Sequence, residues 1–127
     1  MAKSDYRPFR PAKRPGGRPR GAPQFRVLVH HRMHERWSEL VQRVGLESAQ
    51  QFYDHVAHTP DRPSDINRTT ILRGRASRPS DPGFSRTVHY EISGAARIDY
   101  QYHPQFLGRQ GDTHAVVRIL AITYTSH

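Results

Sequence analysis

The chain has 127 residues, no cysteine and a formal net charge of +9. This length favours one domain with its own core, and the lack of cysteine excludes disulfides, thiolate metal sites and a cysteine nucleophile. No apolar run is long enough for a membrane span or a signal peptide, so we expect a cytoplasmic protein without a membrane partner. A basic protein of this kind usually binds a polyanion, such as nucleic acid or the ribosome.

Residues 1–24 are predicted to form a disordered basic arm. The segment contains five prolines, which prevent a helix, and it has almost no apolar side chains to bury. Its seven basic residues outnumber a single acid, and Arg14, Arg18 and Arg20 are candidates for contacts with RNA or DNA phosphates. The alternative is a solubilising extension without a dedicated partner.

Residues 25–127 are predicted to form one domain that begins with a strand and two helices. Residues 25–30 alternate as in a strand. Residues 31–45 and 46–57 carry apolar side chains at helical spacing, and Gly45 separates them into a helical hairpin. One apolar stripe on the first helix is either core or, where exposed, a groove for a partner protein. The stripe consists of Trp37, Leu40, Val41 and Val44.

Three strands are predicted after a polar, irregular segment, which gives the order β-α-α-β-β-β. They cover residues 86–92, 97–102 and 114–125, with a loop at 104–113 between the last two. The third strand is the most apolar, as expected for a central strand covered on both faces. The predicted fold class is therefore α+β: an antiparallel sheet with the helical hairpin on one face and the other face partly open.

The strand at residues 97–102 raises the question of what the open face does. Its alternation assigns Ile98, Tyr100 and Tyr102 to the core. The other side of the strand carries Arg97, Asp99 and Gln101. A guanidinium on an open face suits phosphate oxygens, whereas an ion pair with a neighbouring acid is the structural alternative.

Several motifs together resemble the RelE/ParE superfamily of bacterial toxins over residues 25–127. They are the element order, the step Leu72-Arg73-Gly74, the strand "RIDYQY" at 97–102 and the closing strand "VVRILAITY" at 116–124. The resemblance implies the toxin of a type II toxin–antitoxin system, with a cognate antitoxin as partner. RelE-like members cleave mRNA in the ribosomal A site, whereas ParE-like members inhibit gyrase and cleave nothing.

The resemblance also implies site residues. Arg97 matches the arginine that RelE-like enzymes use near the scissile phosphate, and Tyr124 and His127 fall where such enzymes place aromatic or imidazole groups. From the residues themselves, His89 shares the face of Arg97 if the two strands pair across Gly94, and it can then act as a base or an acid.

Three further arginines flank the same predicted edge and are candidates for binding the RNA backbone: Arg73, Arg75 and Arg86. A solvated loop is the alternative for each of them. We expect no metal and no small-molecule cofactor. His30, His31 and His34 cluster in sequence, but no acid at ligand spacing completes a site.

Three functions remain open from the sequence. The first is a ribosome-dependent endoribonuclease, in which Arg97 stabilises phosphate charge and His89, Tyr124 or His127 moves protons. The second is a non-catalytic protein of the same fold, either a gyrase-inhibiting ParE-like toxin or a basic RNA- or ribosome-binding module. The third is a structural subunit whose basic arm threads into RNA.

Overall fold

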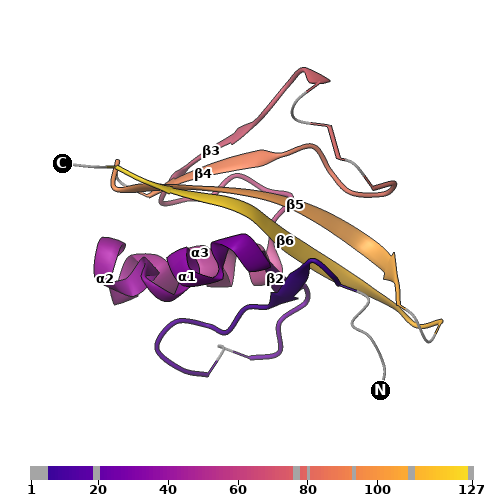
Figure 1. Ribbon diagram of the computed structural model, residues 1–127, viewed down its shortest axis with the longest axis horizontal. Coiled ribbons are helices and arrows are strands. Elements are labelled where there is room, and N and C mark those ends of the chain that lie inside the picture. The colour runs from indigo at the N-terminus through magenta and orange to yellow at the C-terminus, as the bar shows by residue number, and fades with distance from the viewer. Residues whose placement is uncertain are drawn as a thin grey trace.

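A computed structural model of the chain describes residues 6–18, 21–75, 78–79, 81–92, 94–108 and 111–125. Within these residues, helices cover one face of a six-stranded sheet (Figure 1). This arrangement confirms the predicted α+β class. No helix in the described part of the chain is both long enough and apolar enough to cross a bilayer.

The sheet has the strand order β1-β2-β6-β5-β4-β3. The bounds are Phe9–Pro11 (β1), Arg26–His30 (β2), Arg68–Ile71 (β3), Val88–Ile92 (β4), Ala96–Leu107 (β5) and Thr113–Tyr124 (β6). β2 runs parallel to β6, and the other neighbouring pairs are antiparallel. β6 therefore lies inside the sheet, and its residues from Val116 to Ile119 are all buried, as predicted for a strand covered on both faces.

Three features of the sheet differ from the sequence prediction. An antiparallel sheet was expected, but the sheet is mixed because β2 runs parallel to β6. β3 lies in the segment that we expected to be irregular; its sequence RTTI has a single apolar residue, and pairing with β4 is what makes it a strand. The predicted loop at 104–113 is shorter, because β5 and β6 continue to pair as far as Leu107 and Thr113. The ladder is irregular between His103 and Phe106, where Pro104 has no N–H to donate.

The helices form a single layer against the sheet. A 3₁₀ turn at His31–Met33 leads into α1 (His34–Ser38) and α2 (Leu40–Val44), and α3 spans Leu46–His58. Gly45 separates α2 from α3 with φ of +90°, a backbone conformation that favours glycine. Trp37 and Leu40 are buried, so most of the apolar stripe on the first helices is core, although Val41 is exposed.

Aromatic side chains build the core between helices and sheet. The ring of Phe52 on α3 lies 4.9 Å from that of Tyr90 and 6.2 Å from that of Tyr100, and all three side chains are fully buried. The hydroxyl of Tyr100 donates to the carbonyl oxygen of Pro60 at 2.8 Å. Burial raises the pKa of Tyr100, which keeps this donor protonated. The contact fixes the chain that follows α3 against β5.

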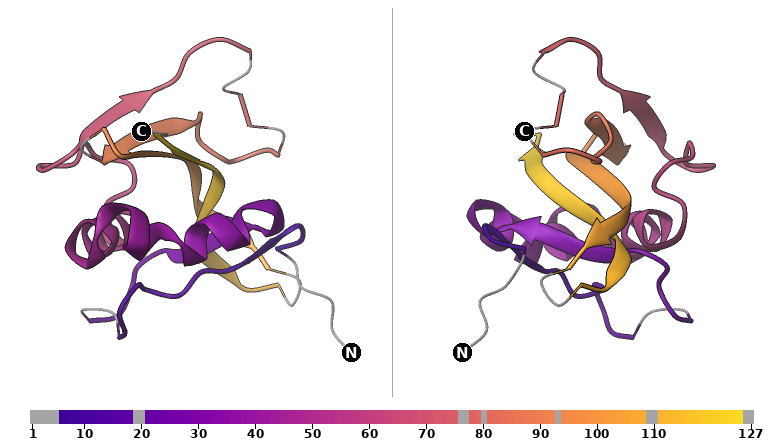
Figure 2. Two further views of the ribbon diagram at one scale, coloured as in Figure 1. Left: turned by 60° about the vertical axis from the view of Figure 1, so that its left-hand side comes forward. Right: turned by 90° about the vertical axis from the view of Figure 1, so that its right-hand side faces the viewer.

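The expectation of a disordered arm over residues 1–24 requires correction for residues 6–18. β1 adds to the outer edge of β2, and the N–H of Ala12 donates to the carbonyl of Val27 at 2.8 Å. Prolines permit this pairing because an edge strand leaves half of its backbone groups outside the ladder. Beyond β1, the chain runs alongside the helical layer (Figure 2).

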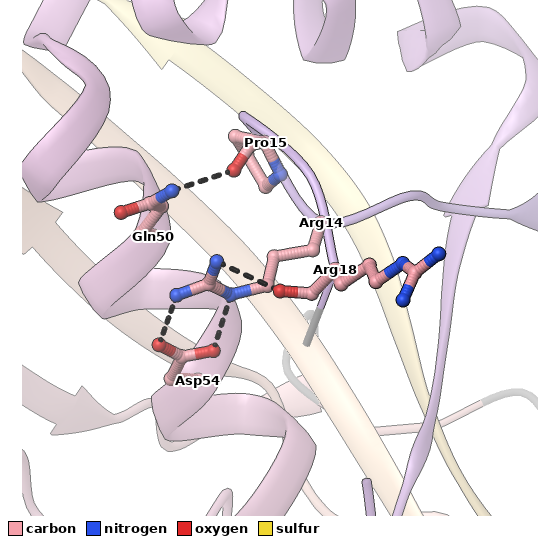
Figure 3. A network of polar contacts seen from close by, with 5 residues as sticks. All are labelled: Arg14, Pro15, Arg18, Gln50 and Asp54. Atoms are coloured by element: carbon pink, nitrogen blue, oxygen red, sulfur yellow. Dashed lines mark hydrogen bonds and ion pairs between the residues drawn. The ribbon is translucent and has the colours of Figure 1, made fainter. Parts of the chain in front are cut away.

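Arg14 anchors this N-terminal segment to α3. Its Nε and Nη2 donate to the two carboxylate oxygens of Asp54 at 2.9 Å each, and its Nη1 donates to the carbonyl of Arg18 at 3.1 Å (Figure 3). Gln50 on the same helix donates to the carbonyl of Pro15 at 3.1 Å. Hydrogen bonding to Asp54 raises the pKa of Arg14, whose side chain is only 9% exposed. This guanidinium therefore serves the fold and is not free for a phosphate.

Replacing Arg14 with alanine should lower the free energy of unfolding by about 1–2 kcal/mol, because Asp54 loses a bidentate partner and the segment loses its anchor. Urea unfolding followed by circular dichroism measures the change. Arg18→Ala is the matched control, since its side chain is exposed and points away from α3 (Figure 3), and it should change stability by less than about 0.5 kcal/mol. Equal effects of the two substitutions would contradict the anchoring role.

Candidate functional site

Arg97 lies on the face of the sheet opposite the helices. It alternates on β5 with Ala96 and Ile98, which are buried in the core under the helical layer. Its own side chain is exposed, and it makes no hydrogen bond or ion pair with any described residue. The structural alternative, an ion pair with Glu91 or Asp99, is thus not formed. Arg97 is available to a ligand on the helix-free face.

His89 and Asp99 form a pair beside Arg97. β4 and β5 pair across Gly94 as expected, and the register sets His89 directly opposite Asp99. The Nδ1 atom of His89 contacts a carboxylate oxygen of Asp99, and both side chains are about one-fifth exposed, at 19% and 22%. An ionised carboxylate only accepts, so Nδ1 is the donor, and in a neutral imidazole Nε2 is then the nitrogen with the lone pair. This is the arrangement of an oriented general base.

The register extends the site across the sheet. One row runs from Arg68 on β3 through Glu91 on β4 and Arg97 on β5 to Thr123 on β6. Arg68 is exposed and, like Arg97, has no ion pair within the described chain. Sequence reasoning missed it because β3 was not predicted. Glu91 lies between the two arginines in this row, and its negative charge offsets part of their positive charge.

The neighbouring row is Thr70, His89, Asp99 and Ala121. Ala121 and Thr123 are short side chains on β6, and they leave room beside His89 and Arg97. A shallow hollow of about 270 Å³ adjoins the end of this region and is lined by Glu91, Arg97 and Thr123 among others. Together the two rows, from Arg68 to Thr123 and from Thr70 to Ala121, form what we call the open-face site.

The rest of this face is covered by the chain itself, which corrects the expectation for Gln101. Arg118 is 6% exposed and donates from Nε and Nη2 to Oε1 of Gln101, at 3.1 and 2.8 Å, and from Nη1 to Asp81 at 2.6 Å. The ring of Phe84 lies 3.7 Å from the Arg118 guanidinium carbon. Gln101 is therefore buried, and it donates in turn to the hydroxyl of Thr87 at 3.1 Å. Asp81 and Phe84 come from the segment before β4, whose position the sequence did not reveal.

Tyr124 does not join the open-face site. Alternation on β6 directs it to the helical side, where its hydroxyl donates to the carbonyl of Arg36 and the Arg43 guanidinium lies 4.9 Å from its ring centre. Burial raises the pKa of Tyr124 to about 12. A phenol held in this way is a poor proton donor to a ligand on the other face. The tyrosine borders the same shallow hollow as Arg97, but only from the helical side.

The other candidate residues are scattered. His127 and Arg20 lie outside the described residues. Arg18 and Arg75 are exposed, and neither belongs to the two rows of the open-face site. Arg73 and Arg86 were expected at the same edge as Arg97, but they line a cavity on the helical side of the sheet.

The histidines near β2 do not form a ligand set. The rings of His30 and His31 stack at 4.8 Å, and Nδ1 of His30 accepts from the backbone N–H of Arg32 at 3.1 Å. In the described parts of the chain, no three histidine or acidic side chains are grouped as metal ligands would be. Elsewhere, His114 contacts Asp112 and Tyr6 in a pairwise manner.

Comparisons with protein-family models, with curated proteins and with solved structures gave no match. The resemblance to the RelE/ParE superfamily therefore rests on the motifs in the sequence. An argument about function has to start from the chemistry of the open-face site.

Two arginines on one face, Arg97 and Arg118, should respond differently to removal. Arg118→Ala is expected to lower the free energy of unfolding by about 2–4 kcal/mol, because Gln101 loses a buried partner and Phe84 loses its packing surface. Arg97→Ala should change it by less than about 0.5 kcal/mol, since that side chain is exposed. Chemical denaturation of both variants measures the difference, and a similar cost for the two would contradict the division of this face into covered and uncovered parts.

Proposed function

We propose that the chain is a RelE-like toxin that cleaves mRNA on the ribosome at the open-face site. The observation that carries the proposal is the pairing of His89 with Asp99 beside an exposed Arg97 that has no partner among the described residues. The element order and the strand "RIDYQY" support the same proposal through their resemblance to this family. A cognate antitoxin is the protein partner that such a toxin implies.

In this proposal, His89 is the general base. Asp99 orients the imidazole ring through Nδ1, and Nε2 removes the proton from the ribose 2′-hydroxyl. The resulting oxygen attacks the adjacent phosphorus, and the bond to the 5′-oxygen breaks. The 5′-oxygen takes a proton from water, because Tyr124 is committed to Arg36 and no second imidazole lies in the two rows of the open-face site.

Arg97 stabilises the charge that builds on the phosphate oxygens. It lies diagonally across the β4–β5 ladder from His89, which corresponds to roughly 7–8 Å between such positions and is within reach of one phosphodiester. Its guanidinium fork matches two phosphate oxygens. Arg68, in the same row, is placed to bind the next phosphate along the strand.

A second candidate is a non-catalytic toxin of the ParE-like kind. The observation that favours it is the balance of charge at the open-face site, where Glu91 and Asp99 offset Arg68 and Arg97. A polyanion prefers a face with excess positive charge, whereas a protein surface is compatible with mixed charges. Such a toxin would inhibit gyrase without cutting RNA.

Expression of the chain in a bacterial host should arrest growth, and primer extension should then show cuts in mRNA at codon-phased positions. Arg97→Ala is expected to lower cleavage by about 10²–10³-fold, as loss of one electrostatic contact to the transition state does. His89→Asn should lower it by about 10²–10⁴-fold. Both variants should keep the circular dichroism spectrum of the parent chain.

The matched control is Arg18→Ala, which removes an exposed arginine that is not part of the open-face site. It should leave toxicity and cleavage unchanged. Growth arrest with loss of supercoiling and without cuts would support the second candidate. Undiminished cleavage in both Arg97→Ala and His89→Asn would contradict the catalytic roles assigned to these residues.

A further inference from the structure

A cavity of about 740 Å³ opens on the helical side of the sheet, near the end of α3. It shares no lining residue with the hollow beside Arg97, and its volume is in the range of small-molecule sites. β3, β4 and β5 provide one wall of this cavity, and the turn from Pro60 to Pro63 provides another. We call it the β3–β4 cavity.

Alternation brings a row of three polar side chains to this cavity. Ile71 pairs with Val88, and Val88 pairs with Tyr100. Continuing the β3–β4 register by two residues sets Arg73 opposite Arg86, and the backbone supports this step because the N–H of Leu72 donates to the carbonyl of Thr87 at 2.8 Å. On the other side of β4, the N–H of Ser85 donates to the carbonyl of Tyr102 at 2.8 Å, which places Tyr102 next to the start of β4. All three side chains line the cavity.

The two arginines line the same cavity, and the extended register sets their backbone positions opposite each other. Like charges directly opposite across a ladder destabilise a sheet. Neither Arg73 nor Arg86 forms an ion pair with the described chain, and Arg86 donates only to the carbonyl of Gly74, at 3.2 Å. Arg62 adds a third positive charge to the lining, against the single carboxylate of Asp61. An anion bound between Arg73 and Arg86 would remove this repulsion.

The neighbouring part of the cavity is apolar and aromatic. Val88, Pro60 and Ile71 contribute apolar surface, and Ile71, on the edge strand β3, is 60% exposed. Tyr102 is half-buried, and its hydroxyl makes no hydrogen bond within the described residues. Burial raises the pKa of Tyr102, so this hydroxyl is a neutral donor. The combination suits a flat ring lying next to a phosphate.

We infer that the β3–β4 cavity binds one nucleotide unit, with its phosphate between Arg73 and Arg86 and its base against Tyr102 and Ile71. Stacking of a base on an aromatic ring tolerates any base, and Asp61 can accept from the amino group of a base that has one. The unit is either a free nucleotide or one residue of a single RNA strand. The site stands apart from the open-face site and does not depend on catalysis there.

Binding of two probes to the full chain tests this inference. The probes are a nucleoside 5′-monophosphate and a fluorescent single-stranded oligoribonucleotide. For both probes, binding is followed through the ¹H–¹⁵N chemical shifts of the protein's amides, and for the labelled strand it is also followed by fluorescence anisotropy. We expect shifts to concentrate at the amides of Ile71, Val88 and Tyr102. If the monophosphate displaces the RNA, the site takes a free nucleotide; if only RNA binds, it takes a nucleotide within a strand.

Variants locate the phosphate contact. Arg73→Gln and Arg86→Gln should each weaken binding by at least about tenfold, because a charge-assisted contact to phosphate is lost. Neither should lower the melting temperature of the free protein, since each removes half of a like-charge pair. Arg75→Gln is the matched control, a nearby exposed arginine outside the cavity, and it should weaken binding by less than about threefold.

Three results would overturn the inference. The first is an equal loss for Arg75→Gln and Arg73→Gln, which would mean nonspecific attraction. The second is the absence of binding by either probe up to about 1 mM. The third is a set of chemical-shift changes centred on His89 and Arg97 in place of the cavity. Loss of mRNA cleavage in Arg97→Ala with nucleotide binding intact would separate this site from the proposed nuclease.

Discussion

The position of β6 between β2 and β5 is the constraint on which the rest of the structure depends. Parallel pairing with β2 brings the start of the domain beside its end, and antiparallel pairing with β5 sets Ala121 opposite Asp99 and Thr123 opposite Arg97 at the open-face site. β6 also divides that face. Arg118 lies on the covered part, and the short side chains of Ala121 and Thr123 lie on the uncovered part. A shift of one residue in β6 would turn these side chains towards the helices.

Two arginines on the helix-free face of the sheet, Arg118 and Arg97, differ in burial and in hydrogen-bond partners. Arg118 is enclosed by Gln101, Asp81 and the ring of Phe84, so its hydrogen-bonding capacity is used within the fold. Arg97 faces solvent beside the His89–Asp99 pair and keeps its guanidinium free of described partners. A guanidinium is expensive to bury without partners, so the covering segment has to supply them. On the uncovered part, the Arg97 guanidinium is in contact with water, needs no such partner, and can bind a ligand.

The positive charge of the protein is distributed over several surfaces with different roles. In the N-terminal segment, Arg14 is paired with Asp54 and stabilises the fold. At the open-face site, Arg68 and Arg97 are offset by Glu91 and Asp99, so this surface carries little excess positive charge. In the β3–β4 cavity, Arg62, Arg73 and Arg86 share the lining with a single acid, Asp61. Net charge alone predicts a polyanionic partner, but only the pairing of each arginine indicates where that partner can bind.

Local patterns in the sequence determined β2, β4, β5 and β6, the helical layer and the side of β5 on which Arg97 lies, because alternation and helical spacing depend on near neighbours alone. Tertiary structure decided the rest. β1 and β3 exist because β2 and β4 offer them ladder partners, and the covering of Gln101 follows from a segment with no pattern of its own. The pairing of β3 with β4 also adds Arg68 to the open-face site. Arg73 and Arg86 line a cavity on the opposite face from Arg97, although the sequence predicted one shared edge for all three. Strand pairing and the choice of covered face are contacts between distant residues, and a single sequence carries no local signal for them.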